Sequence, residues 1–76
     1  MIREHESAVL TADLPSAGLL AGDVGVVVHV YEGGKAYEIE FIAFDGNTVA
    51  VETLDAEMVR PVRARELPHV RNIAVA

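Results

Sequence analysis

G-D-V-G-V-V-V-H-V-Y, residues 22–31, is the longest β-branched run in the chain and predicts the central strand of a sheet. Residues two apart in a strand point to the same face, so one face of this strand is purely aliphatic. Gly25, inside the strand, predicts a β-bulge or the close approach of another backbone. We expect the aliphatic face to point into the core, and it consists of Val24, Val26, Val28 and Val30.

Four further segments have the composition of short strands, and turn residues separate them. The best turn signals are the Gly-Gly pair in residues 32–35 and the Asp-Gly pair in residues 45–47, because such pairs are typical of tight hairpins. Pro61 confines the last segment to a sheet edge or a strand end. The pattern predicts a small antiparallel barrel, with strands over residues 6–11, 22–31, 36–44, 48–54 and 58–62.

Residues 36–44 show the clearest alternation in the sequence. Tyr37, Ile39 and Phe41 share one face, which we expect to point inward. Glu38 and Glu40 share the other face, where they could imitate a catalytic carboxylate pair. In a chain this small, with no cleft implied, we expect them to be solvent-facing charges.

Two irregular features accompany the strands. Apolar residues on the glutamate side at the end of this third strand predict a bulge or a strand end near Phe41. Residues 12–21 have no sustained period and predict a long loop. We expect its leucines, Leu14, Leu19 and Leu20, to fold back on the core.

The length of 76 residues is enough for one domain with one compact core. The absence of cysteine excludes disulfides and thiolate metal sites and fits a reducing compartment. The first residues lack the basic start and apolar core of a signal peptide, and charges interrupt every apolar run before the roughly 20 residues that span a bilayer. We therefore expect a cytoplasmic protein that is not embedded in a membrane.

The formal net charge of −6 is unevenly placed. The body from Glu4 to Glu57 holds a single base, Lys35, whereas four arginines cluster near the C-terminus. An acidic body repels phosphate backbones, so the charge balance argues against binding of DNA or RNA. A salt-bridging or partner-docking role fits the arginines better, and they are Arg60, Arg63, Arg65 and Arg71.

No residue pattern in the chain predicts catalysis, cofactor binding or metal binding. His5, His29 and His69 are too far apart in sequence for the ligand spacing of structural zinc. The glycine-bearing stretch of residues 18–25 leads into a strand, whereas phosphate-binding loops lead from a strand into a helix. We therefore expect no cofactor, no metal ion and no enzymatic activity.

Residues 64–76 form a C-terminal extension beyond the expected barrel domain of residues 1–63, and they are too apolar for a mere solvated tail. One alternative is that Leu67, Val70 and Ile73 close the open end of the barrel. The other is that the extension is an interaction segment, with I-A-V-A, residues 73–76, adding as a strand to a neighbouring chain. The sequence leaves both open.

Five motifs of the sequence are distinctive in combination: D-L-P (13–15), G-L-L-A-G-D-V-G (18–25), V-V-H-V-Y-E-G-G (27–34), A-Y-E-I-E-F (36–41) and D-G-N-T-V-A (45–50). Through these motifs the chain resembles a family of small bacterial proteins known only as a domain of unknown function. The resemblance covers roughly residues 6–63 and rests on several combined motifs. It departs at Val26 and His29, where relatives tend to carry polar residues, and the extension lies outside the shared pattern.

This resemblance implies an SH3-like barrel, no enzymatic activity, and gene neighbourhoods that include toxin–antitoxin-like pairs. We predict an all-β, five-stranded SH3-like barrel that acts as a non-enzymatic binding module for a protein, as an antitoxin-like or accessory partner or as a homodimer formed through the extension. The alternatives are a nucleic-acid-binding barrel that uses the C-terminal arginines and an accessory subunit of an enzyme. The candidate partner-binding residues are Tyr31, Glu38, Glu40, Arg63, Arg65 and Arg71.

Overall fold

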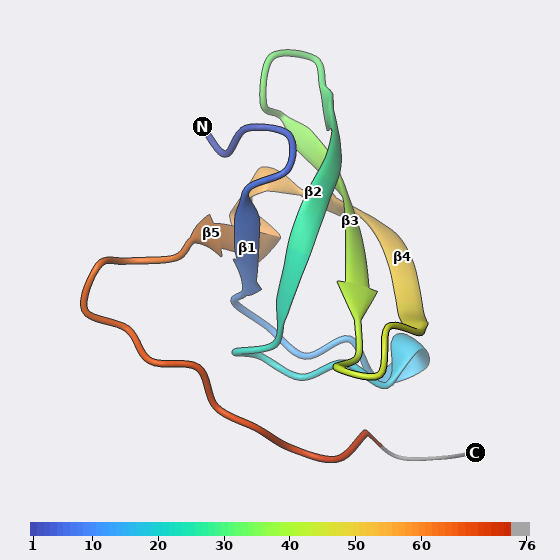
Figure 1. The fold of residues 1–76 in the computed structure, drawn as a ribbon. Helices are drawn as coiled ribbons and strands as arrows, with labels where there is room; N and C mark the ends of the chain where they lie inside the picture. Colours follow the sequence, from blue (N-terminus) through green and yellow to red (C-terminus); the bar gives the residue numbers. More distant parts are fainter. Residues whose placement is uncertain (74–76) are drawn as a thin grey trace.

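The computed structural model describes residues 1–73 and shows one antiparallel sheet of five strands in the order β4-β3-β2-β1-β5 (Figure 1). The sheet curls around its inner face, as the predicted SH3-like barrel requires, so the all-β prediction is confirmed. Two short 3₁₀ turns, η1 and η2, connect strands. The elements are β1 (Ser7–Leu10), η1 (Pro15–Ala17), β2 (Val24–Tyr31), β3 (Ala36–Ile42), β4 (Thr48–Asp55), η2 (Ala56–Met58) and β5 (Val59–Pro61).

The inner face of the sheet carries the hydrophobic core. The predicted inward face of β3 is confirmed, because Tyr37, Ile39 and Phe41 are all buried. Residues from every strand and from the loop before β2 complete the cluster, and burial of this apolar surface supplies most of the stability that a domain of this size can have. The further core residues are Ile2, Ala8, Leu10, Leu19, Val27, Leu54 and Val59.

The predicted inward face of β2 is wrong at Val24 and Val26 and right at Val30. Val24 is 50% exposed, whereas Val27 is fully buried, so the core-facing residue lies on the opposite face at this point. The pairing of β2 with β3 shifts between Val27 and His29, which places Val28 in a bulge. The bulge reverses the alternation, and Val30 then packs against the core.

Gly25 explains why the core side of β2 could not be recognised from apolar residues alone. A β-carbon at this position would lie 2.5 Å from Cγ2 of Ile39 and 2.9 Å from the carbonyl oxygen of Glu40. The residue is therefore buried on the inner face without a side chain, as the predicted close backbone approach requires.

The predicted turns and the predicted irregularity of β3 are present. Gly33 and Gly34 have φ of 67° and 103° in the β2–β3 loop, and Gly46 has φ of 90° in the β3–β4 loop. The pairing of β3 with β4 shifts between Phe41 and Ile42, which confirms the bulge expected there.

The loop before β2 covers one end of the core, but only partly as predicted. Leu19 is buried and Leu14 packs against the core, whereas Leu20 is exposed. The backbone N–H of Leu20 is instead held by the carboxylate of Asp23 at 2.9 Å, which turns its side chain outward at the entry to β2. At the N-terminus, Ile2 is buried and its N–H donates to the Tyr37 hydroxyl at 3.2 Å, a contact that the sequence did not predict.

Beyond β5 the chain continues as an irregular segment, residues 62–73, which we call the arm. It leaves the barrel at the left of Figure 1 and runs beneath the sheet toward the opposite side. Leu67 and Val70 are 90% and 71% exposed and Ile73 is also exposed, so these residues do not close the barrel, and that alternative is wrong. Residues 74–76, which belong to the predicted I-A-V-A strand, lie outside the described residues.

Candidate protein-binding surface

Three of the predicted binding residues meet on the outer face of the sheet, opposite the core. Tyr31 lies on β2, whereas Glu38 and Glu40 lie on β3. Glu38 pairs with His29 on one side and with Thr53 on the other, so the polar side chains of three strands lie next to one another. The alternation that buries the aromatic residues of β3 is therefore also what displays the two glutamates.

A hydrogen bond and ring packing fix the side chains of Tyr31, Glu38 and His29 on this face. The hydroxyl of Tyr31 donates to Oε1 of Glu38 at 2.9 Å, and the ring of His29 packs edge-on against that of Tyr31 with centroids 4.4 Å apart. The hydrogen bond to the carboxylate raises the pKa of Tyr31, because the neutral phenol is the donor. A neutral, oriented tyrosine and a carboxylate are thus presented together to solvent.

The lower part of the outer face is apolar around one carboxylate. Glu40 accepts a hydrogen bond of 2.6 Å from the Thr48 hydroxyl, and it pairs across the sheet with Val26 and Val51. Several β-branched side chains lie on the same face, and Val24, Ile42 and Val51 among them are about half exposed. We group Glu38 with these residues and call the resulting surface the outer patch, which consists of Val24, Val26, Glu38, Glu40, Ile42 and Val51.

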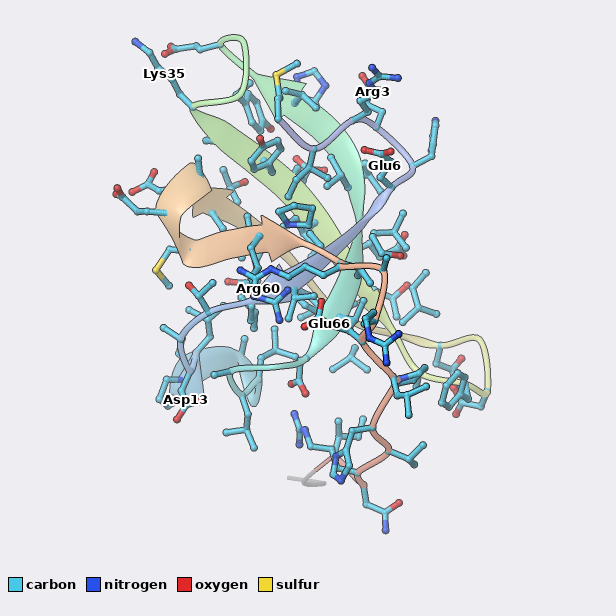
Figure 2. All side chains as sticks on the ribbon, turned by 90° about the vertical axis from the view of Figure 1, so that its left-hand side faces the viewer. Arg3, Glu6, Asp13, Lys35, Arg60 and Glu66 are labelled. Atoms are coloured by element: carbon cyan, nitrogen blue, oxygen red, sulfur yellow. The ribbon has the colours of Figure 1, made fainter. Side chains whose placement is uncertain are left out.

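The arm carries the other three predicted residues, and an ion pair holds its first part to the sheet. Arg60 of β5 donates to both oxygens of Glu66, at 2.8 and 2.5 Å. Figure 2 shows the two side chains pointing toward one another. The backbone N–H of Arg63 donates to the same carboxylate at 2.7 Å. Together these contacts, the guanidinium of Arg60 first, lower the pKa of Glu66 to about 2.

A second ion pair holds the far part of the arm. Nε and Nη2 of Arg71 donate to the two oxygens of Asp23 at 2.9 and 2.5 Å, and Nη2 also donates to the carbonyl oxygen of Gly18 at 3.2 Å. Arg71 therefore has a salt-bridging role within the chain, as proposed for the arginines from the sequence. It is not a free contact residue.

Arg63 and Arg65 differ from Arg71. Both are exposed, and within residues 1–73 neither side chain forms an ion pair with a carboxylate. The structure thus divides the six predicted residues into three outer-face residues, two free arginines of the arm, and one arginine that anchors the arm.

Sequence reasoning missed the acceptors of the two ion pairs, Asp23 and Glu66, and the exposed valines of the outer patch. Asp23 looked like a turn residue, and its partner is 48 positions away. The valines were assigned to the core because their face of β2 is uniformly aliphatic. The one available signal was Gly25, which marks the side of the strand against which another element packs closely.

Among residues 1–73, no group of three or more histidine or acidic side chains is placed to hold a metal ion. The same part of the chain contains no helix long and apolar enough to cross a membrane.

One family model matches residues 4–61, and it is described as a domain of unknown function, DUF4926. The chain belongs to the DUF4926 family. The matched residues include all five strands, so the curled sheet and the outer patch lie within the DUF4926 domain, and residues 62–73 of the arm follow it. No curated protein and no solved structure matches the chain.

Proposed function

We propose that this DUF4926 protein is a non-enzymatic binding module for another protein chain, with the arm as its main contact segment. The observation that carries the proposal is the exposure of Leu67 and Val70, 90% and 71%, on a segment whose two ends are held by ion pairs. Burial of a leucine or valine side chain is worth about 1.5–3 kcal/mol. A segment that is anchored and yet presents such side chains to water is suited to bury them against a partner.

Charge supports a protein partner over a nucleic acid. The chain has a net charge of −6. Arg60 on β5 and Arg71 in the arm are already paired with carboxylates. A nucleic-acid interface needs several free cations to release counterions from phosphates. Fluorescence anisotropy with random duplex and single-stranded DNA should show no binding at physiological salt, and micromolar affinity with a steep salt dependence would favour the nucleic-acid alternative.

The partner class follows from the family resemblance. We propose a bacterial, cytoplasmic accessory role, in which the chain binds a toxin-like protein, an enzyme or a second copy of itself. Tyr31, Glu38 and Glu40 would supply oriented polar contacts on the outer face, whereas Arg63 and Arg65 would supply charge on the arm. Aromatic residues and arginines are enriched where protein interfaces hold most of their binding energy.

The test is a comparison of three full-length proteins as bait in a lysate of the source organism. The double variant Leu67→Ser/Val70→Ser should lose a partner that the parent captures. Phe44→Ser is the matched control, since Phe44 is 94% exposed but lies on the β3–β4 loop. A partner retained by the double variant and lost by Phe44→Ser would overturn the role of the arm.

A further inference from the structure

The outer patch and the arm carry opposite charge. The outer patch contains two carboxylates, Glu38 and Glu40, and strands β2, β3 and β4 contain no lysine or arginine. The arm contains the two free arginines, Arg63 and Arg65. The patch has no cation of its own, and the one acidic residue of the arm, Glu66, is already paired with Arg60.

Both surfaces also expose apolar side chains to water. Val24, Ile42 and Val51 of the outer patch are 50%, 47% and 49% exposed, and Leu67 and Val70 of the arm are more exposed still. Burial of either set would remove apolar area from water. A basic, apolar segment is thus the occupant that the acidic, apolar patch fits.

The two anchor points of the arm lie close to the outer patch of its own chain. Val9 pairs across the sheet with Val24 on one side and with Arg60 on the other, so these three residues form one row on the outer face. The other end of the arm is anchored on Asp23, next to Val24. Val9 itself is only 6% exposed, whereas Val24, Ile42 and Val51 of the patch stay about half exposed.

From this arrangement we propose that the outer patch of one copy binds the arm of a second copy, so that two chains form a reciprocal dimer. The inference rests on the proposed function and names its partner. A two-fold axis would let each copy supply one arm and one patch, and a closed interface of this kind uses both surfaces of both chains. Arg63 and Arg65 would face Glu38 and Glu40, while Leu67 and Val70 would cover the valines.

Charge exchange tests the proposal on full-length chains by analytical ultracentrifugation. The patch variant Glu38→Arg/Glu40→Arg and the arm variant Arg63→Glu/Arg65→Glu should each raise the dimer dissociation constant at least about tenfold, or about 1.4 kcal/mol. An equimolar mixture of the patch variant and the arm variant should regain dimers. In such a mixed pair the basic patch of one chain meets the acidic arm of the other, and the acidic patch of the second chain meets the basic arm of the first. Glu4→Arg/Glu57→Arg, two exposed glutamates outside the patch and the arm, is the matched control and should remain as dimeric as the parent.

A second variant keeps the test decisive if the patch variant does not fold. Ile42→Ser/Val51→Ser shortens exposed side chains only and should likewise weaken the dimer. A parent that stays monomeric at every concentration, or a mixture that fails to regain dimers, overturns the reciprocal dimer. If Leu67→Ser/Val70→Ser dissociates the parent dimer but the patch variants do not, the arm keeps its proposed function and the outer patch is not its acceptor.

Discussion

Arg71 donates two hydrogen bonds, of 2.9 and 2.5 Å, to the carboxylate of Asp23, 48 positions earlier in the chain. Asp23 also accepts from the backbone N–H of Leu20, so its carboxylate joins the arm, the loop and the start of β2. The guanidinium of Arg71, more than the opposing effect of burial, lowers the pKa of Asp23. The position of the arm on the barrel is therefore set by charge, while its apolar side chains remain available.

The corrected face of β2 gives a direct prediction. Val27→Asp should prevent folding, because it places an unpaired charge in the only core, at a cost of about 3 kcal/mol or more. Val24→Asp changes a half-exposed residue of the same strand and should cost about 1 kcal/mol. Thermal unfolding followed by circular dichroism separates them. Equal loss of the transition in both variants would mean that the assigned faces are wrong.

Close packing at Gly25 predicts an unusual sensitivity to a single methyl group. Gly25→Ala should destabilise the domain by about 3 kcal/mol, because the new carbon meets Cγ2 of Ile39 and a backbone oxygen that the β2–β3 pairing holds in place. Gly18→Ala is the control, since a β-carbon there meets no atom within 4 Å. Its only cost is that alanine must adopt φ of 71°, which destabilises the folded state by about 1 kcal/mol. If urea unfolding gave the same loss in the free energy of unfolding for both variants, it would contradict the close approach of Gly25 to Ile39.

The Arg60–Glu66 pair predicts an acid-sensitive attachment of the arm. Because pairing lowers the pKa of Glu66 from its usual 4.5 to about 2, the attachment is complete above pH 4.5 and is lost as the pH falls through about 2. Titration of the Glu66 side-chain carbon by nuclear magnetic resonance should have its midpoint near 2. Arg60→Met should move the midpoint toward 4.5 and the control Arg65→Met should not, whereas a parent midpoint already near 4.5 would show that the pair does not form.

The sequence predicted the elements of this fold better than their faces. Alternation in residues 36–44 identified the inner side of β3 because every inward residue there is large and apolar. The same method failed on β2, where valines occupy both faces, the inward residue at position 25 has no side chain, and a bulge at Val28 reverses the period. Hydrophobic periodicity locates a strand, but packing against β3 decides which side is buried.

The candidate surface was predicted only in part for a related reason. Surface charges such as Glu38, Glu40, Arg63 and Arg65 can be recognised from composition, because charged residues rarely enter a small core. The partner of Arg71 could not, since the pair with Asp23 depends on how the arm folds back after β5. The outer patch became visible only when the buried side of β2 was known.

Truncation after Arg63 tests most directly whether the arm serves association, with melting temperature and light scattering measured on the same two proteins. We expect the shortened chain to fold with a melting temperature within a few degrees of the parent, because the removed Leu67 and Val70 lie outside the core and ion pairs at the surface contribute little to stability. We also expect it to be monomeric at concentrations where the parent associates. A sharply lower melting temperature with an unchanged oligomeric state would contradict this role of the arm.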